Sequence, residues 1–176
     1  SPEAAEPQVT ELIETLTTTE DSRTRVITID AIADKLRGGL PALAALTKSL
    51  DDSEPRVRWH AARAIGLIGH EAAAAIPSLL KLLKDPDPVA VTQAAWAIGH
   101  IRNDDPRDDI PPADAAHYAS AVEPLVDTML HPDPRARRAA VRSLKAVSTS
   151  KEQVLTAVQR HLADADPTAV MPALHT

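Results

Sequence analysis

The chain contains no cysteine and no phenylalanine, and its only aromatic side chains are Trp59, Trp96 and Tyr118. Without cysteine it can form no disulfide, no thiolate nucleophile and no metal site built on sulfur. So few rings exclude most cofactor pockets that are lined by aromatic side chains, and we predict no cofactor. No apolar run approaches the roughly 18 residues of a membrane-spanning helix, so we expect no segment to cross a membrane.

A surplus of positive charge is also missing. Nineteen Lys and Arg residues stand against 25 Asp and Glu residues, which gives a net charge of −6. A protein whose main surface grips nucleic-acid phosphates needs a basic face, so we do not expect a nucleic-acid partner. The first residues, Ser1-Pro2-Glu3, show neither an initiator Met nor a signal-peptide pattern. We interpret the sequence as an excised or processed piece, and its compartment stays open.

Prolines recur at a fixed spacing along the chain. Pro55, Pro88, Pro134 and Pro167 are separated by 33, 46 and 33 residues, and a further step of 33 back from Pro55 reaches Ser22. An acidic residue precedes each position: Asp21, Glu54, Asp87, Asp133 and Asp166. An acidic residue followed by proline is typical of a helix start, because the carboxylate accepts from a free N–H and proline needs no hydrogen bond there. The spacing therefore predicts five helices, each of which we name helix B.

Apolar residues repeat in the same register. Each predicted helix B has one large apolar position, occupied by Ile32, Ile65, Ile98 and Leu144. A shorter apolar pattern precedes each helix B and predicts a helix A, as in Leu43/Leu46/Leu50 and Ile76/Leu79/Leu83. One such pair cannot bury its apolar face alone, whereas stacked pairs can. We predict an all-α, right-handed α-solenoid of about five helix pairs forming a single domain, with units at 8–38, 40–71, 75–103, 113–149 and 151–176.

The second unit resembles a known repeat. Residues 52–69 read Asp-Ser-Glu-Pro-Arg-Val-Arg-Trp-His-Ala-Ala-Arg-Ala-Ile-Gly-Leu-Ile-Gly, with the pattern Asp-x-x-Pro-x-Val-Arg-x-x-Ala-Ala-x-Ala-Ile-Gly. This is similar to the short bacterial HEAT repeats of phycobilisome lyases. The resemblance implies a solenoid whose B helices line the concave side and which mostly binds other proteins. Two later units depart from the pattern. In the third unit Val91 occupies the position of Arg58, and in the fourth unit His131 occupies the position of Asp52.

The same resemblance implies a ladder between neighbouring repeats. Arg25, Arg58 and Arg137 share one position of the repeat, and Asp52, Asp85 and Asp164 share another. In HEAT-like arrays such residues usually form Asp–Arg hydrogen bonds, so we assign them to structure. Gly66 and Gly99, which are 33 residues apart, are interpreted as positions of close helix packing.

Thirteen extra residues interrupt the period between the third and fourth units, at about 102–115. We expect a solvated acidic loop followed by a helix A longer by one or two turns. Asp104, Asp105, Asp108 and Asp109 could in principle bind Ca²⁺. Their spacing is not that of a known calcium loop, glycine is absent, and Arg102 and Arg107 lie among them. We therefore predict no metal.

One face of the B helices combines basic and aromatic side chains away from the Ala/Ile stripe. We predict that this concave face binds a protein or peptide, possibly an acidic one, because Trp and Arg provide large contact energies. Alternatively, the tryptophans only cover helix ends and the arginines are solvated. The predicted binding face consists of Arg56, Trp59, His60, Arg63, Trp96, His100, Arg138 and Arg142.

The alternative is an enzyme, or an enzyme subunit, on the same solenoid: a lyase, a metal-dependent hydroxylase or a DNA glycosylase. The hydroxylase would need several His-Glu dipeptides, and only His70-Glu71 is present. The glycosylase would need a catalytic carboxylate, for which Asp30 is the sole suggestion. Because no catalytic constellation emerges, we predict a non-catalytic scaffold.

The C-terminal unit is incomplete in its pattern. Pro172 falls inside the last predicted helix B, where proline removes a hydrogen bond and clashes with the preceding turn. We expect that helix to stop by about Val170, which would leave apolar surface uncovered. The chain is therefore expected either to continue beyond Thr176 or to self-associate through this end. Alternatively, residues 166–176 fold back as an irregular cap over that surface.

Overall fold

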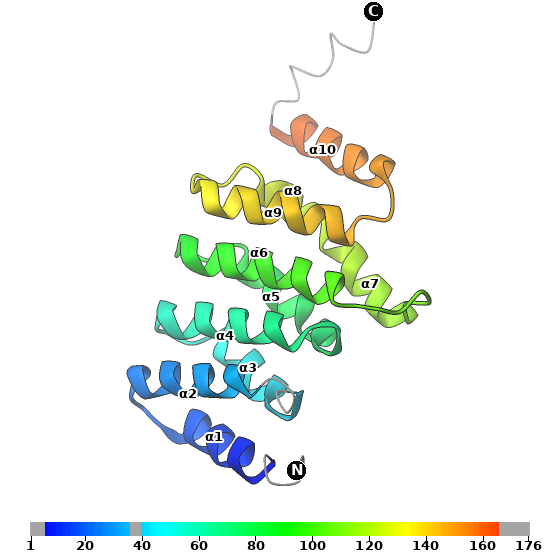
Figure 1. Cartoon of the computed structure of the whole chain (residues 1–176). Coiled ribbons are helices and arrows are strands. Elements are labelled where there is room, and N and C mark those ends of the chain that lie inside the picture. Colours follow the sequence, from blue (N-terminus) through cyan, green and yellow to red (C-terminus); the bar gives the residue numbers. More distant parts are fainter. Residues whose placement is uncertain (1–5, 36–39, 166–176) are drawn as a thin grey trace, which may run out of the picture.

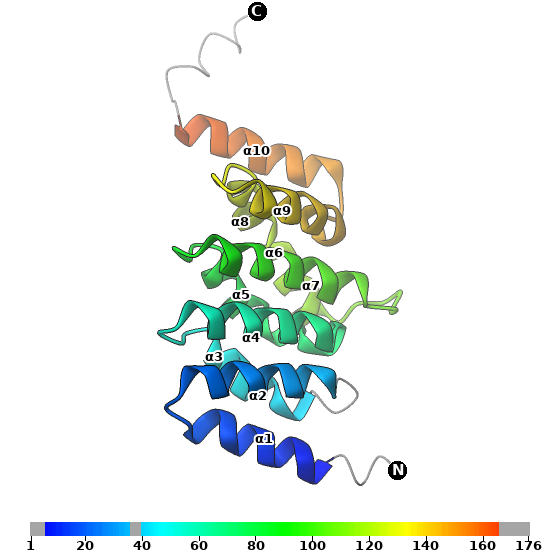
Figure 2. The ribbon, with the colours of Figure 1, turned by 60° about the vertical axis from the view of Figure 1, so that its left-hand side comes forward.

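The computed structural model describes residues 6–35 and 40–165, and within these ranges every regular element is helical. Successive helix pairs stack into an elongated α-solenoid (Figure 1). One layer consists of the B helices α2 (Ser22–Asp34), α4 (Pro55–Ile68), α6 (Pro88–Asn103) and α9 (Pro134–Val147). A second layer of short A helices lies behind it: α3 (Leu43–Ser49), α5 (Ile76–Leu82) and α8 (Val122–Thr128). At the two ends of the stack lie α1 (Glu6–Thr18) and α10 (Lys151–Ala165) (Figure 2).

Four B helices begin where the repeat predicted them, at Ser22, Pro55, Pro88 and Pro134. The acidic residue before the helix caps three of these four starts. The side chains of Asp21, Asp87 and Asp133 accept from the backbone N–H groups of Thr24, Val89 and Arg135. The exception is Glu54, whose side chain makes no cap hydrogen bond. The fifth predicted start, at Pro167, lies outside the described residues.

The hydrophobic core runs along the solenoid between the two layers. Each B helix contributes its predicted large apolar residue, and Ile65 and Ile98 are completely buried. The A helices contribute Leu46, Leu79 and Leu125, which are equally buried. Because residues at one repeat position share one environment, the predicted register is confirmed.

Glycine lets neighbouring B helices approach closely. A Cβ added at Gly66 would lie 2.6 Å from Cζ3 of Trp96 and 2.9 Å from Cα of Ala97. One added at Gly99 would lie 2.8 Å from Cα of Ser143. Real Cβ atoms do not make such contacts, so any larger residue would push the next helix away. The predicted packing role of both glycines is confirmed.

Two rungs of the Asp–Arg ladder are present. Arg25 pairs with Asp52, with 2.8 Å between Nε and Oδ2. Arg58 donates from Nε and Nη2 to the two carboxylate oxygens of Asp85, at 2.7 and 2.9 Å. Each rung therefore ties the helix B of one unit to the following unit through a charge-assisted contact.

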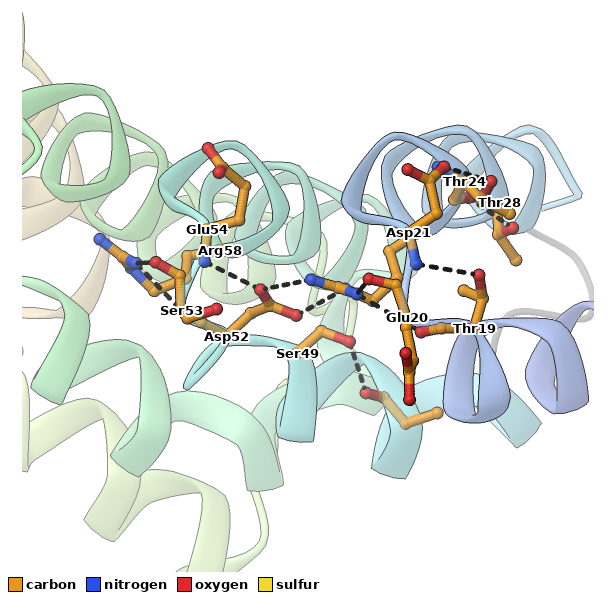
Figure 3. Close-up of polar contacts among 12 residues, drawn as sticks. Thr19, Glu20, Asp21, Thr24, Thr28, Ser49, Asp52, Ser53, Glu54 and Arg58 are labelled. Atoms are coloured by element: carbon orange, nitrogen blue, oxygen red, sulfur yellow. Dashed lines mark hydrogen bonds and ion pairs between the residues drawn. The ribbon is translucent and has the colours of Figure 1, made fainter.

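The ladder residues also order the turn inside their own units. Nη1 of Arg58 donates to the carbonyls of Asp52 and Ser53, at 2.9 and 3.1 Å (Figure 3). Asp52 in turn accepts from the backbone N–H of Glu54 at 2.9 Å. Arg137 donates to the turn carbonyls of its own unit in the same way. The predicted partner of Arg137 is Asp164, whose side chain is not among those that the structure describes.

The rung between α6 and α9 is missing because both of its residues are replaced. Val91 is buried at the arginine position. At the Asp position, Nδ1 of His131 accepts from the N–H of Asp133 at 3.0 Å and so preserves the turn. A different contact ties these helices, since the buried Ser143 hydroxyl donates to the Ala95 carbonyl at 2.5 Å.

The inserted segment departs from the prediction of one lengthened helix A. The structure has two helices there, α7 (Pro112–Ser120) and α8, which are separated at Ala121. The break follows from Pro124, because a proline clashes with the carbonyl four residues earlier, here that of Ser120. The segment therefore turns sharply instead of extending straight.

The last described helix, α10, exposes two leucines. Leu155 is 57% and Leu162 is 56% exposed, whereas Val154 and Val158 pack against the core. We predicted that the last helix B stops before Pro172 and that the chain self-associates through this end. Both predictions concern residues 166–176, which lie outside the residues that the structure describes. Both stay predictions.

Replacing Ile98 by Ala is expected to lower the free energy of unfolding by about 2–5 kcal/mol, because the cavity forms in a fully buried site. The matched control is Ile27→Ala on α2, where Ile27 is 62% exposed and the expected change is below about 0.5 kcal/mol. Urea unfolding followed by circular dichroism measures both. Equal effects of the two variants would show that the core register is wrong.

The ladder can be tested by a double-mutant cycle on Arg58 and Asp85. Their side chains are only 12% and 8% exposed, so we expect a coupling free energy of about 1–3 kcal/mol. The control pair is Arg135 and Asp133, which lies within one unit and whose arginine side chain is 58% exposed. Its coupling should stay below about 1 kcal/mol. A negligible coupling at Arg58–Asp85 would remove the ladder's role in stability.

Candidate binding groove

A groove of about 510 Å³ opens on the B-helix layer between α6 and α9, with one side chain of α4 at its edge. Five residues of the predicted binding face line it together: Arg63, Trp96, His100, Arg138 and Arg142. The repeat brings them together because they lie on one face of three successive B helices. The remaining lining residues are Thr92, Gln93, Gly99, Asn103, Arg135, Ala139 and Ser143.

The groove is basic although the chain is acidic. Its lining includes four arginines and no carboxylate. Arg135 is neutralised by Asp133 at 2.7 Å. Among the described residues, the exposed guanidinium groups of Arg63, Arg138 and Arg142 have neither a hydrogen-bond nor an ion-pair partner. These three cations are therefore available to an anionic group from outside.

One wall of the groove is aromatic. The rings of Trp96 and His100, one helical turn apart on α6, stack with centroids 4.8 Å apart and planes inclined by 17°. Trp96 is half-buried and lies against Gly66 of the preceding helix, where no larger residue fits. Its indole is consequently held in place before any ligand arrives.

Three residues of the predicted face lie outside this groove. Arg56 is exposed on α4. His60 donates from Nδ1 to Asp30 of α2 at 2.7 Å and stacks on Trp59, with ring centroids 3.7 Å apart. The cluster of Trp59, His60 and Asp30 joins the first two units. It includes Asp30, the carboxylate suggested above for a glycosylase.

The sequence reasoning missed Gln93 and Asn103 as groove residues. They stand three residues before and seven residues after Trp96 on α6. Helical periodicity places such positions on the face that bears Trp96, so the signal was present in the sequence. Neither residue is charged or aromatic, and composition alone did not single them out.

The inserted loop is more ordered than the solvated loop that the sequence predicted. The carboxylate of Asp105 is buried and accepts from Nε and Nη2 of Arg107, both at 2.7 Å, and from the Tyr118 hydroxyl at 3.3 Å. These hydrogen bonds from Arg107 hold the pKa of Asp105 well below its usual range. Arg107 also contacts Asp114 at 2.8 Å. The prediction was wrong for Asp105 because its partner Tyr118 lies thirteen residues further along the chain.

The loop also contacts the preceding unit. Asp104 accepts from the backbone N–H of His70 at 3.3 Å, at the start of the 3₁₀ helix η4 (His70–Ala75). Asp108 and Asp109 are exposed. Across residues 6–35 and 40–165, no three acidic or His side chains gather closely enough to hold a metal ion. None of the helices in these ranges has the length and hydropathy needed to cross a membrane.

The sequence profile of the HEAT repeats matches this chain in three overlapping segments, residues 9–97, 43–112 and 76–174. The chain therefore belongs to the HEAT-repeat family, whose fold is a scaffold of stacked helix pairs. No curated protein matches the sequence.

Solved structures share the fold. The chain is similar to the crystal structures of two engineered proteins, each 24% identical, with TM-scores of 0.69 and 0.66. These alignments cover 87% and 86% of this chain and 67% and 40% of the engineered chains. It is also similar to the complex of CpcE and CpcF of phycocyanin lyase from Nostoc sp. PCC7120, at 19% identity and a TM-score of 0.50. That alignment covers 81% of this chain and 65% of the other, so the chain spans about two thirds or less of each structure.

Tyr118 is the only tyrosine of the chain, so phenolate absorbance reports on it alone. Its burial, together with the charge of Asp105, raises the pKa of Tyr118 to about 12. An absorbance titration of the folded protein should therefore give a midpoint about 2 units above the ordinary value near 10. A raised pKa stabilises the fold below about pH 10, and this contribution is lost as the pH rises through about 12.

The control is Asp105→Asn, which removes the neighbouring charge and should lower that midpoint. A midpoint near 10 in the folded protein would contradict the Asp105–Tyr118 contact.

Proposed function

We propose that this chain is a non-catalytic scaffold module that binds an acidic segment of a protein partner in the groove between α6 and α9. The observation behind the proposal is the set of unpaired guanidinium groups of Arg63, Arg138 and Arg142 beside the stacked rings of Trp96 and His100. Without a carboxylate in the lining, only an external anion can neutralise these cations.

The spacing of the arginines suits a peptide. Arg138 and Arg142 are four residues apart on α9, so their side chains emerge on one face about 6 Å apart along the helix axis. Acidic side chains two residues apart on an extended strand are separated by about 7 Å. Each guanidinium can donate two hydrogen bonds to one carboxylate in a bidentate contact. An extended segment with alternate acidic residues would therefore engage both.

Trp96 would supply the apolar part of the binding energy. A tryptophan that is already fixed against Gly66 loses little side-chain freedom on binding. Trp and Arg residues are the most frequent hot spots of protein interfaces. The lyase activity in the name of the similar Nostoc complex is not needed to account for any residue of this groove.

Binding can be followed through Trp96 fluorescence in a Trp59→Phe background, which leaves Trp96 as the only tryptophan. The probe is an extended hexapeptide of alternating Glu and Ser, with a Lys and Ser peptide of equal length as the control. The acidic peptide should change the emission saturably and the basic one should not. In Arg138→Ala/Arg142→Ala the dissociation constant should rise at least about tenfold, since two charge-assisted contacts are lost.

The matched control is Lys145→Ala/Lys151→Ala, which removes the same charge from exposed positions outside the groove. Its affinity should stay within about threefold of the parent protein, because exposed charges act weakly at moderate salt. Equal losses in the two double variants would mean that net charge, and not the groove, attracts the peptide.

A further inference from the structure

The tip of the inserted loop, Asp108 and Asp109, carries negative charge, opposite to the charge of the groove. Resting on the function proposed above, we infer that the acidic segment bound there is the 104–111 loop of a second copy of this chain. The two copies would form a reciprocal dimer in which each loop occupies the groove of the other.

The tip has a net negative charge because the cations of the insertion are already engaged. Arg107 is held by Asp105 and Asp114, and Arg102 lies over the Tyr118 ring, 5.4 Å from its centroid. Asp108 and Asp109 are exposed, and no partner contacts them among the described residues. Two carboxylates are thus left for a positive surface outside the loop. They are adjacent and lie at a bend of the chain, so the loop would engage the arginines in a different geometry from the extended peptide with alternate acidic residues.

The loop is preorganised. Asp104 is bonded to the N–H of His70, Asp105 is buried in its network, and Ile110 packs against the hydrophobic core. A loop that is fixed on both sides of its tip pays little ordering entropy when it docks.

The loop is anchored away from its own groove. It leaves the end of α6 and projects from the edge of the stack beside α7 (Figure 1). Its anchors, His70 and Tyr118, belong to η4 and α7 rather than to the groove. Asn103, the last residue before the loop, lines the groove. Loop and groove are therefore neighbours on one chain, and a two-fold axis can pair each loop with the other groove.

The overall charge does not prevent this pairing. Two copies of net charge −6 repel each other, but at about 0.15 M salt exposed charges are screened beyond about 8 Å. The contact between carboxylates and guanidinium groups is made at shorter range and is retained.

The test uses charge reversal at exposed positions of the full chain. One variant reverses the groove, Arg138→Glu/Arg142→Glu, and the other reverses the tip, Asp108→Lys/Asp109→Lys. Sedimentation velocity at rising concentration should show that the parent chain dimerises. Each variant alone should have a dimer dissociation constant at least about tenfold higher, because both of its contacts become repulsive. An equimolar mixture should form a heterodimer, since both contacts are again between opposite charges.

Circular dichroism checks that both variants are folded. If either is not, Arg138→Ala/Arg142→Ala and Asp108→Asn/Asp109→Asn replace them, and a mixture should then associate more strongly than either alone. A parent chain that stays monomeric at millimolar concentration would overturn the inference. So would a dimer that neither pair of substitutions weakens, such as one formed through the C-terminal end, or a mixture that does not associate.

The acidic hexapeptide separates this inference from the proposed function. Binding of that peptide by a parent chain that stays monomeric would preserve the groove's function and exclude the second copy as its partner. If the parent chain neither binds the peptide nor dimerises, both proposals fail.

Discussion

The close approach of successive B helices is the constraint on which the rest of this structure depends. A single helix pair of this size cannot bury its apolar face, and neighbouring pairs stack tightly where a glycine on one helix lets the next helix approach. Gly66 against Trp96 and Ala97, and Gly99 against Ser143, define that distance. With the helices at this separation, one continuous core forms behind them, and the two Asp–Arg rungs reach from α2 and α4 to the unit that follows each of them.

The same approach shapes the groove. Because Gly66 has no side chain, the indole of Trp96 can lie against α4 while it stacks on His100 in the groove. Ser143 at the groove lining is bonded to Ala95, so the position of α9 and of its arginines relative to Trp96 is fixed by packing. The groove is thus a by-product of helix stacking, and its lining residues occupy the positions that stacking leaves outward.

The sequence predicted whatever follows from local rules and from the period. Helix starts at Pro88 and Pro134 need only a cap and a proline, and the burial of Ile65 and Ile98 needs only the register. Contacts that depend on how units meet in space could not be derived in that way. The pairing of His60 with Asp30 separated one part of the predicted face from the rest, and that of Asp105 with Tyr118 ordered a loop expected to be solvated.

The interface between α6 and α9 shows how these features depend on each other. A partly buried arginine without its aspartate would leave an uncompensated charge, so replacing only one member of the rung would destabilise the stack. Here Val91 and His131 replace both, and no charge is stranded. The polar contact between these two helices is instead made by Ser143, which lines the groove. The inserted loop begins at the end of α6. The interface that lacks the repeat's ordinary rung is therefore the one at which this chain can place a basic groove and an acidic loop side by side.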